Sequence, residues 1–142
     1  DSMGKVMKAR IIARGGVVEG EALVSPKPLG FNLGVDVPNG IIIEHGHPLE
    51  GVCFKDKVFV FPNGKGSTGG SYVVYQLIEG KTGPIAFVNH KTDTIVAAGC
   101  IMGRLPTVDN LSDEDYHSIE TGDWVRVDSV NGTVEIIRKK GE

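Results

Sequence analysis

The chain has little cysteine, few aromatic residues and no excess of positive charge. Its 142 residues include two cysteines, Cys53 and Cys100, and neither belongs to a CxxC pair. A disulfide framework or a site built from cysteine pairs is therefore disfavoured, and both thiols are predicted to be buried and free. The formal net charge of −3 offers no basic surface for nucleic acid and no polybasic patch for a membrane.

Long apolar segments and targeting signals are also missing. No hydrophobic run approaches the roughly 20 residues of a membrane span, and the first residues show no signal-peptide pattern. We therefore expect a cytoplasmic protein. Asp1-Ser2-Met3 is interpreted as a remnant ahead of a natural start at Met3 or Met7, so residues 1–6 are expected to be foreign to the fold or disordered. The composition is not typical of a hyperthermophilic protein.

The remaining pattern predicts a single mixed α/β domain over residues 1–142. A hairpin through Arg14-Gly15-Gly16 is predicted at one end and another through Asn131-Gly132 at the other. Asp93 or Thr94, and Ser112, are the expected helix caps. Strands are predicted at 7–13, 17–24, 41–43, 51–61, 84–89, 105–108, 123–129 and 133–138, and helices at 71–79, 95–102 and 113–119.

Glycine is abundant, and its densest cluster carries the strongest functional signal. The 20 glycines include Gly64, Gly66, Gly69 and Gly70, which lie between a predicted strand and a predicted helix. Glycine allows close approach of the backbone to a ligand, and the N–H groups at a helix N-terminus attract anions. Ser67 stands in the middle of this loop. The pattern predicts an anion site that contains a candidate base or nucleophile.

Three familiar motifs fit this loop less well. Gly64, Gly66 and Gly69 match a dinucleotide fingerprint, but no acidic residue occupies the ribose-binding position after the next strand. A Walker A loop is excluded because Gly66 follows Lys65. A hydrolase elbow is excluded because Lys65, not glycine, stands two residues before Ser67.

Other polar residues have simpler interpretations. Ser67 could be a plain helix cap, although Thr68 and Ser71 could cap equally well. Lys65 could bind substrate anions or be solvated. His45 and His47 are expected in an exposed polar loop rather than a metal site, and His90 and His117 at the surface. Trp124 is expected to anchor the C-terminal hairpin to the core. With no acid near Ser67 in sequence, the chain holds half of a site, which implies a partner subunit.

The span from Arg10 to Ile137 resembles the small subunit of the aconitase X family. The most specific part is the run Phe-Pro-x-Gly-Lys-Gly-Ser-Thr-x-Gly-Ser-Tyr at 61–72. Supporting segments are Gly20-Glu21-Ala22-Leu23-Val24, Leu33-Gly34-Val35-Asp36, the strand at 83–88, Asp93-x-Ile95-x-Ala97-x-Gly99 and Leu105-Pro106-x-Val108-Asp109. The resemblance implies a swivelling β/β/α three-layer domain like the one at the C-terminal end of aconitases.

The resemblance also implies a hydro-lyase shared between two chains and inactive as a single chain. A large partner would carry an iron–sulfur cluster on its own cysteines, with no metal ligand in this chain. Ser67 would remove the proton alpha to the carboxylate of a small anionic hydroxy acid. The implied substrate-binding residues are Lys65, Gly66, Thr68, Gly69, Gly70 and Ser71.

Two substrates are associated with this family, cis-3-hydroxy-L-proline and mevalonate 5-phosphate. The mesophile-like composition favours the hydroxyproline branch slightly. Two other functions remain open beside the dehydratase and the dinucleotide site. One is a non-catalytic module whose glycine loop only docks a partner. The other is a phosphohistidine carrier, which is disfavoured because none of the four histidines lies in the loop.

Overall fold

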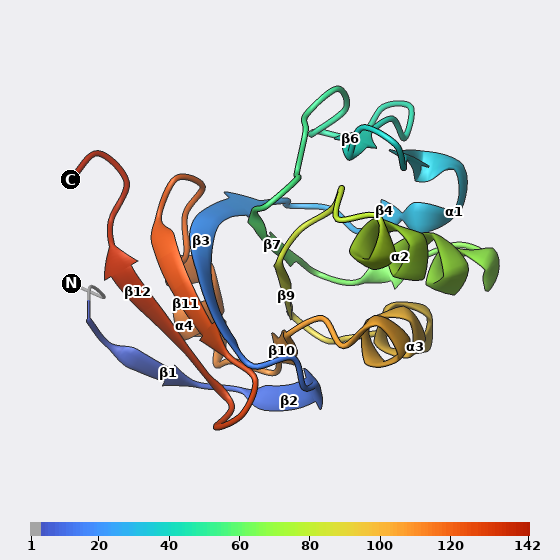
Figure 1. Cartoon of the computed structure of the whole chain (residues 1–142). Coiled ribbons are helices and arrows are strands. Elements are labelled where there is room, and N and C mark those ends of the chain that lie inside the picture. The colour runs from blue at the N-terminus through green and yellow to red at the C-terminus, as the bar shows by residue number, and fades with distance from the viewer. Residues whose placement is uncertain (1–3) are drawn as a thin grey trace.

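The computed structural model describes residues 4–142, whose main sheet curves around one core and carries two helices on its other side (Figure 1). The order of this eight-stranded sheet is β1-β12-β11-β3-β7-β9-β10-β2. Its strands are β1 (Val6–Lys8), β2 (Arg10–Ala13), β3 (Val17–Val24), β7 (Val58–Phe61), β9 (Ala86–Asn89), β10 (Thr107–Asp109), β11 (Trp124–Asp128) and β12 (Thr133–Arg138).

Four short strands and four helices complete the structure. The short strands form two pairs, β4 (Leu29–Gly30) with β8 (Gly64–Lys65), and β5 (Val35–Asp36) with β6 (Ile41–Ile42). The helices are α1 (Phe31–Gly34), α2 (Gly69–Glu79), α3 (Thr94–Gly103) and α4 (Asp113–Ser118). Within residues 4–142, every helix is too short or too polar to span a bilayer.

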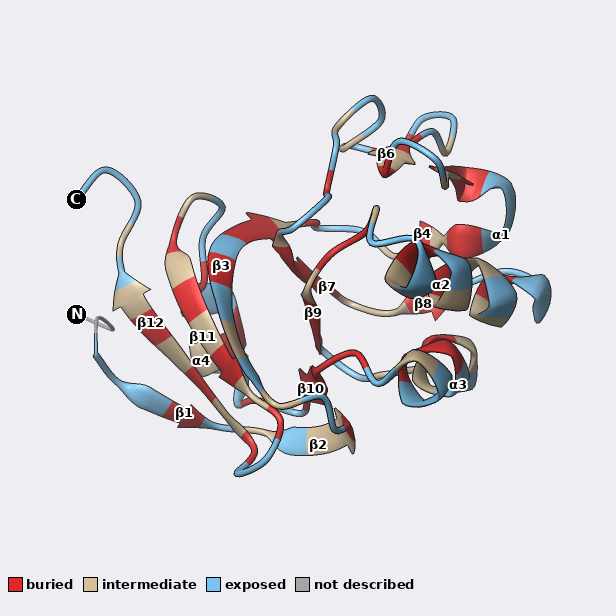
Figure 2. Ribbon diagram, viewed as in Figure 1, coloured by how far each residue is buried: buried red, intermediate tan, exposed pale blue. Residues whose placement is uncertain are grey.

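The two central strands β7 and β9 separate two hydrophobic cores. Val58 and Val60 of β7 pack with the curved β layer, whereas Phe59 and Phe61 pack with α2 and α3. All four are fully buried, as Figure 2 shows for the middle of the molecule. Because successive side chains of a strand point to opposite faces, an unbroken apolar strand must be covered on both sides. The predicted three-layer β/β/α arrangement is confirmed.

Phenylalanine rings fill the core on the helical side. The rings of Phe59 and Phe61 stack with centroids 4.4 Å apart, and Phe87 of β9 lies edge-on to Phe61 at 5.0 Å. Phe31, the first residue of α1, joins them with centroids 5.8 Å from Phe61 and 5.7 Å from Phe87. Such pairs contribute about 0.5–1.5 kcal/mol each beyond burial. The segment after β4 is therefore fixed to the carboxyl ends of the central strands.

The predicted hairpin between residues 7–13 and 17–24 is wrong. β2 pairs with β10, and β3 pairs antiparallel with β11 and parallel with β7. The connection is set by distant contacts, since a Cβ on Gly15 would lie 2.2 Å from the carbonyl oxygen of Arg104. The Gly15 N–H also donates to Ser129 Oγ at 2.8 Å. The glycines thus allow a close crossing rather than a tight hairpin.

Most of the other predicted elements are present with shifted ends. The three predicted helices and the C-terminal hairpin are confirmed, and Asp93 and Ser112 are the caps of α3 and α4. The long strand predicted at 51–61 is wrong in its first part, because only Val58–Phe61 forms β7. At the N-terminus, Val6 already pairs in β1, so the expected disorder does not extend to it. Residues 1–3 of that expectation lie outside the described part of the chain.

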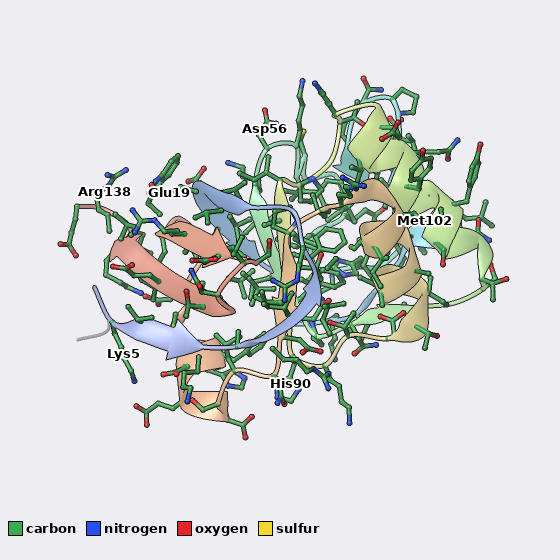
Figure 3. The ribbon with its side chains drawn as sticks, turned by 60° about the horizontal axis from the view of Figure 1, so that its bottom comes forward. Lys5, Glu19, Asp56, His90, Met102 and Arg138 are labelled. Carbon is green, nitrogen blue, oxygen red and sulfur yellow. The ribbon has the colours of Figure 1, made fainter. Side chains whose placement is uncertain are left out.

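Two predictions about single side chains are wrong. Trp124 does not reach the core but lies partly buried on the outer side of β11, where its Nε1 donates to Glu19 Oε1 at 2.9 Å. The Arg138 guanidinium lies 5.7 Å from its ring centroid, and Glu19 and Arg138 are neighbours in Figure 3. Cys53 is exposed, whereas Cys100 is buried, which raises the pKa of its thiol to about 12. Both cysteines are free, as predicted.

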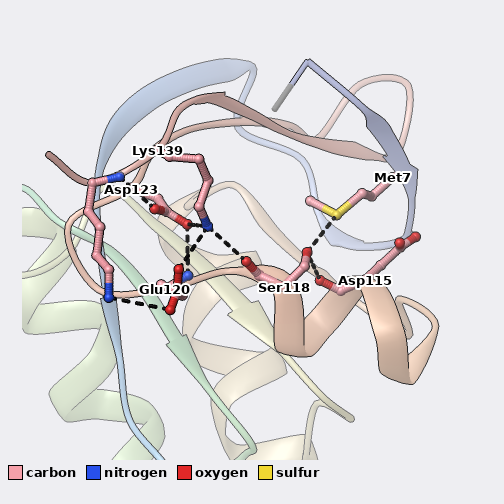
Figure 4. A network of polar contacts seen from close by, with 7 residues as sticks. Met7, Asp115, Ser118, Glu120, Asp123 and Lys139 are labelled. Atoms are coloured by element: carbon pink, nitrogen blue, oxygen red, sulfur yellow. Dashed lines mark hydrogen bonds and ion pairs between the residues drawn. The ribbon is translucent and has the colours of Figure 1, made fainter. Parts of the chain in front are cut away.

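A buried carboxylate ties the C-terminal residues to the end of α4 (Figure 4). Asp123 accepts hydrogen bonds from the N–H groups of Glu120 (2.8 Å) and Lys140 (2.9 Å), and Lys139 Nζ lies 2.7 Å away. Lys139 also donates to the carbonyl oxygen of Ser118. Burial by itself would raise the pKa of Asp123, but Lys139 and the two N–H groups outweigh it, and the pKa is lowered.

We expect Asp123→Asn to destabilise the fold by about 1.5–3 kcal/mol at neutral pH, because a charge-assisted network loses its anion. A lowered pKa in the folded state contributes stability above the ordinary value of about 4, and this contribution is lost as the pH falls below it. Urea unfolding between pH 3 and pH 7 should show the difference between the two proteins shrinking in acid. Glu79→Gln, an exposed carboxylate on α2, is the control, and a pH-independent difference would contradict this account.

Helices α2 and α3 touch at Gly99, where a Cβ would lie 2.7 Å from both the Ser71 carbonyl oxygen and Val74 Cβ. We expect Gly99→Ala to destabilise the protein by about 1–3 kcal/mol through overpacking, although alanine favours an exposed helix position by about 1 kcal/mol. The measurement is chemical unfolding beside Ala98→Gly, an exposed position of α3 that reports helix propensity alone. Stabilisation by Gly99→Ala would refute the close contact.

Candidate functional site

The glycine loop lies where the central strands of the sheet end. β3, β7, β9 and β10 run parallel to one another, so their carboxyl ends lie along the same edge. β7 ends at Phe61, the chain forms the short strand β8, and residues 66–68 lead into α2. Open α/β sheets bind ligands along this edge. The predicted helix begins two residues earlier than expected, at Gly69.

Two of the loop glycines are needed for packing against α3. A Cβ on Gly64 would lie 2.6 Å from Val96 Cγ2, and the Gly64 N–H donates to Asp93 Oδ1 at 2.7 Å. A Cβ on Gly70 would lie 3.0 Å from Ile95 Cγ2. Gly64 therefore does not offer open backbone to a ligand, which weighs against a dinucleotide fingerprint built on it.

The other two glycines shape the exposed part of the loop. Gly66 has φ +93°, a conformation that favours glycine, and a Cβ there would meet open space. A Cβ on Gly69 would lie 3.2 Å from the side-chain amide of Asn32. These two positions set the backbone path on either side of Ser67.

The loop presents backbone N–H groups without partners. Within residues 4–142, the N–H groups of residues 66–69 make no hydrogen bond, while those of Gly70 and Ser71 donate to the carbonyl oxygens of Ser67 and Thr68. The N-cap residue of α2 is Thr68, and no side chain caps the helix. The plain capping interpretation of Ser67 is thus not what the structure shows. The four N–H groups at a helix N-terminus form a cradle suited to an anion.

Ser67 is exposed and receives one hydrogen bond from a distant part of the chain. Asn32 Nδ2, in α1, donates to Ser67 Oγ over 2.5 Å. Beside the loop is a groove of about 320 Å³. It is lined by Gly30, Asn32, Leu33, Gly34, Glu44, His45, Lys65 and Gly66.

Lys65 lies in this groove and is paired with a carboxylate. Its Nζ is 3.0 Å from Glu44 Oε2, and Glu44 Oε1 accepts the N–H of Gly30 at 2.8 Å. Partial burial alone would raise the pKa of Glu44, but the Gly30 N–H and Lys65 lower it overall. Lys65 is therefore held at the groove with its charge partly compensated. Asn32 and Glu44 belong to the candidate site but were not predicted, since neither lies near Ser67 in the chain.

Two predicted substrate-binding residues, Gly70 and Ser71, are not available to a ligand in the structure. Ser71 Oγ donates to the carbonyl oxygen of Ile95 at 2.8 Å and so links α2 to α3. Gly70 is buried. The exposed members of the predicted substrate-binding set are Lys65, Gly66, Thr68 and Gly69, and the predicted base Ser67 is exposed as well.

The first two histidines differ in burial. His45 is exposed, but the prediction that His47 is also exposed is wrong, because His47 is only 6% exposed. Its Nδ1 accepts the Leu49 N–H, which leaves Nε2 to donate to the carbonyl oxygen of Pro28 at 3.1 Å. His47 therefore links the loop around Leu49 to the segment at Pro28.

The two later histidines lie at the surface, as predicted. His90 is half-exposed, and its Nε2 lies 3.0 Å from Asp113 Oδ1, a contact that lowers the pKa of Asp113. Figure 3 places His90 on the outside of the molecule. His117, in α4, is exposed as well. Among residues 4–142, no three or more His, Cys, Asp or Glu side chains gather as a metal site would require.

Comparisons with known proteins agree with this picture. Residues 6–136 match the family model described as the aconitase X swivel domain. The chain is 46% identical to the phosphomevalonate dehydratase small subunit of Methanosarcina acetivorans, over 95% of this chain and 93% of the relative. It is 45% identical to the protein of the same name from Methanocaldococcus jannaschii, over 94% and 98%.

A solved structure is similar over nearly the whole fold. The crystal structure of Thermococcus kodakaraensis aconitase X in its holo-form has a TM-score of 0.87 and 44% identity, covering 94% of this chain and 98% of that one. The region matched by the family model includes the glycine loop and the strands of the main sheet, apart from the last two residues of β12. By sequence and by fold, this chain belongs to the aconitase X swivel-domain family.

Proposed function

We propose that this chain is the small subunit of a hydro-lyase and dehydrates mevalonate 5-phosphate together with a large subunit. Supporting this are relatives 44–46% identical over nearly their full length that carry the name phosphomevalonate dehydratase small subunit. These names favour the phosphorylated substrate over the hydroxyproline expected from composition. The anion cradle at residues 66–69 suits a substrate with a carboxylate and a phosphate. As part of the proposal, the pair acts in the cytoplasm.

The observation that carries the proposal is the exposed Ser67 hydroxyl among N–H groups without partners. In the proposed step, ionised Ser67 Oγ takes the proton from the carbon alpha to the substrate carboxylate. The C–H electron pair moves into a carbon–carbon double bond as the hydroxyl on the next carbon leaves. The N–H groups at the start of α2 stabilise the negative charge that Ser67 and the substrate carboxylate carry during the transfer.

The partner completes what this chain does not provide. An iron–sulfur cluster carried by the large subunit would supply Lewis-acid chemistry to the leaving hydroxyl. This chain offers no three-residue ligand set within residues 4–142. Its own residues bind the anion, orient the substrate and hold the proton at Ser67 Oγ. Lys65, Gly66, Thr68 and Gly69 are the proposed substrate-binding residues, with Lys65 supplying positive charge at the groove.

We expect Ser67→Ala to lower kcat of the reconstituted two-subunit enzyme by about 10³-fold or more, because the base is removed. Far-ultraviolet circular dichroism and size-exclusion chromatography should show an intact fold and an intact complex. Thr133→Ala, which removes a hydroxyl on β12, is the control and should keep full activity. A module that only docks its partner would tolerate Ser67→Ala, so retained activity would end the proposal.

We expect Lys65→Ala to raise KM for mevalonate 5-phosphate by about 10- to 100-fold, the equivalent of one charge-assisted hydrogen bond. The effect on kcat should be smaller, because the ammonium group binds the substrate and does not transfer the proton. Steady-state kinetics with Lys8→Ala on β1 as the matched control would measure this. An unchanged KM would mean that Lys65 only pairs with Glu44 in solvent.

A further inference from the structure

We propose that Asn32 is a positioning residue that acts through Ser67, by donating a hydrogen bond that stabilises the ionised hydroxyl. The inference rests on the proposed role of Ser67 as the base. It adds to that role a side-chain donor from a separate segment of the chain, besides the backbone N–H groups of the loop.

The contact has the chemistry that an ionised serine needs. Asn32 Nδ2 lies 2.5 Å from Ser67 Oγ, and an amide nitrogen of asparagine can only donate. A serine hydroxyl is a weak base until it loses its proton, and donors directed at the oxygen favour the ionised form. The Asn32 amide is neutral, so it stabilises the anion without adding a charge that would compete for the substrate.

The chain on both sides of Asn32 is fixed. Phe31, immediately before it, is 1% exposed and packs among the phenylalanine rings of the core. After it, the carbonyl oxygen of Gly34 accepts the N–H groups of Ile43 (2.9 Å) and Glu44 (3.1 Å). Asn32 therefore stands at the top of a short turn whose two ends cannot move independently of the core.

The turn holds an unfavourable backbone conformation at this point. Leu33 has φ 71°, in the left-handed region, and Asn32 is non-helical with ψ 115°. A left-handed conformation like that of Leu33 is unfavourable in a residue with a side chain. Leu33 gains nothing from burial in return, since it is 87% exposed. The strained turn does, however, direct the Asn32 amide at the loop.

The loop in turn leaves space for the amide. A Cβ on Gly69 would come within 3.2 Å of both Cγ and Nδ2 of Asn32, which is a tight contact. The glycine at position 69 thus accommodates the Asn32 side chain. The α1 turn and the glycine loop, which are far apart in sequence, are thus both compatible with the hydrogen bond between Asn32 and Ser67.

The test is Asn32→Asp in the reconstituted enzyme, because the change keeps the size of the side chain and replaces the donor with a negatively charged acceptor. We expect kcat to fall by about 10²–10³-fold, as for loss of one donor to a developing anion. The rise of kcat/KM with pH should move to higher pH by about one unit or more, since the serine ionises less readily. With substrate deuterated at the alpha carbon, the isotope effect on kcat should increase.

Asn32→Ala should show the same changes to a smaller degree, and Asn131→Ala is the matched control. The Asn131 side chain donates to Asp128 in the turn between β11 and β12, far from Ser67. Circular dichroism and size-exclusion chromatography establish that each variant folds and assembles. A structural role alone would lower the amount of active complex but leave the pH profile and the isotope effect unchanged, and that result would overturn the inference.

Ser67→Ala measured in parallel separates the two proposals. If Ser67→Ala is inactive and Asn32→Asp keeps the wild-type kcat and pH profile, this inference is wrong and the proposed base stands. If Ser67→Ala is active, the proposed function itself is wrong. A fall in kcat for Asn32→Asp with the shifted pH profile supports both.

Discussion

The burial of β7 on both faces is the constraint on which the rest of the structure depends. Its valines and phenylalanines alternate between two cores, so the strand cannot slip by one residue without exposing all of them to the wrong side. This fixes the place where the strand ends. Two residues separate the end of β7 from Gly64, the first glycine of the loop, and α2 starts at Gly69. The position of Ser67 is thus set by the packing of a strand that lies wholly inside the protein.

The site combines a rigid support with a sparsely covered loop. The absence of side chains at Gly64 and Gly70 allows the loop to pack closely against α3. On the other side of the loop, α1 is held in place because Phe31 packs in the phenylalanine core. Between them, the N–H groups of residues 66–69 remain without partners among residues 4–142. A loop of this kind presents donors that need no rearrangement when an anion arrives. A partner that covers the exposed loop would exclude water and strengthen each of these interactions.

Features determined by neighbouring residues could be predicted from the sequence, and those determined by distant contacts could not. The helix after the loop follows from the spacing of Val73, Val74, Leu77 and Ile78, and the C-terminal hairpin from Asn131-Gly132. The predicted first hairpin is wrong because the backbone at Gly15 packs closely against Arg104, which is far away in the sequence. Ser67 could be proposed from the sequence because its glycine context is local and resembles a known family. Asn32 carries no local signal, since its only distinguishing partner is 35 residues away.

The path of β1 into β2 has a consequence for how other chains can approach. β1 and β2 are the two outermost strands of the sheet, yet only Ala9 separates them, and its N–H donates to the carbonyl oxygen of Gly132. The two edge strands of the sheet therefore belong to one bent segment, in which β1 has three residues and β2 has four. Borders so short offer little template for β-augmentation or for edge-to-edge aggregation. An approaching chain therefore finds little free strand edge on the curved layer.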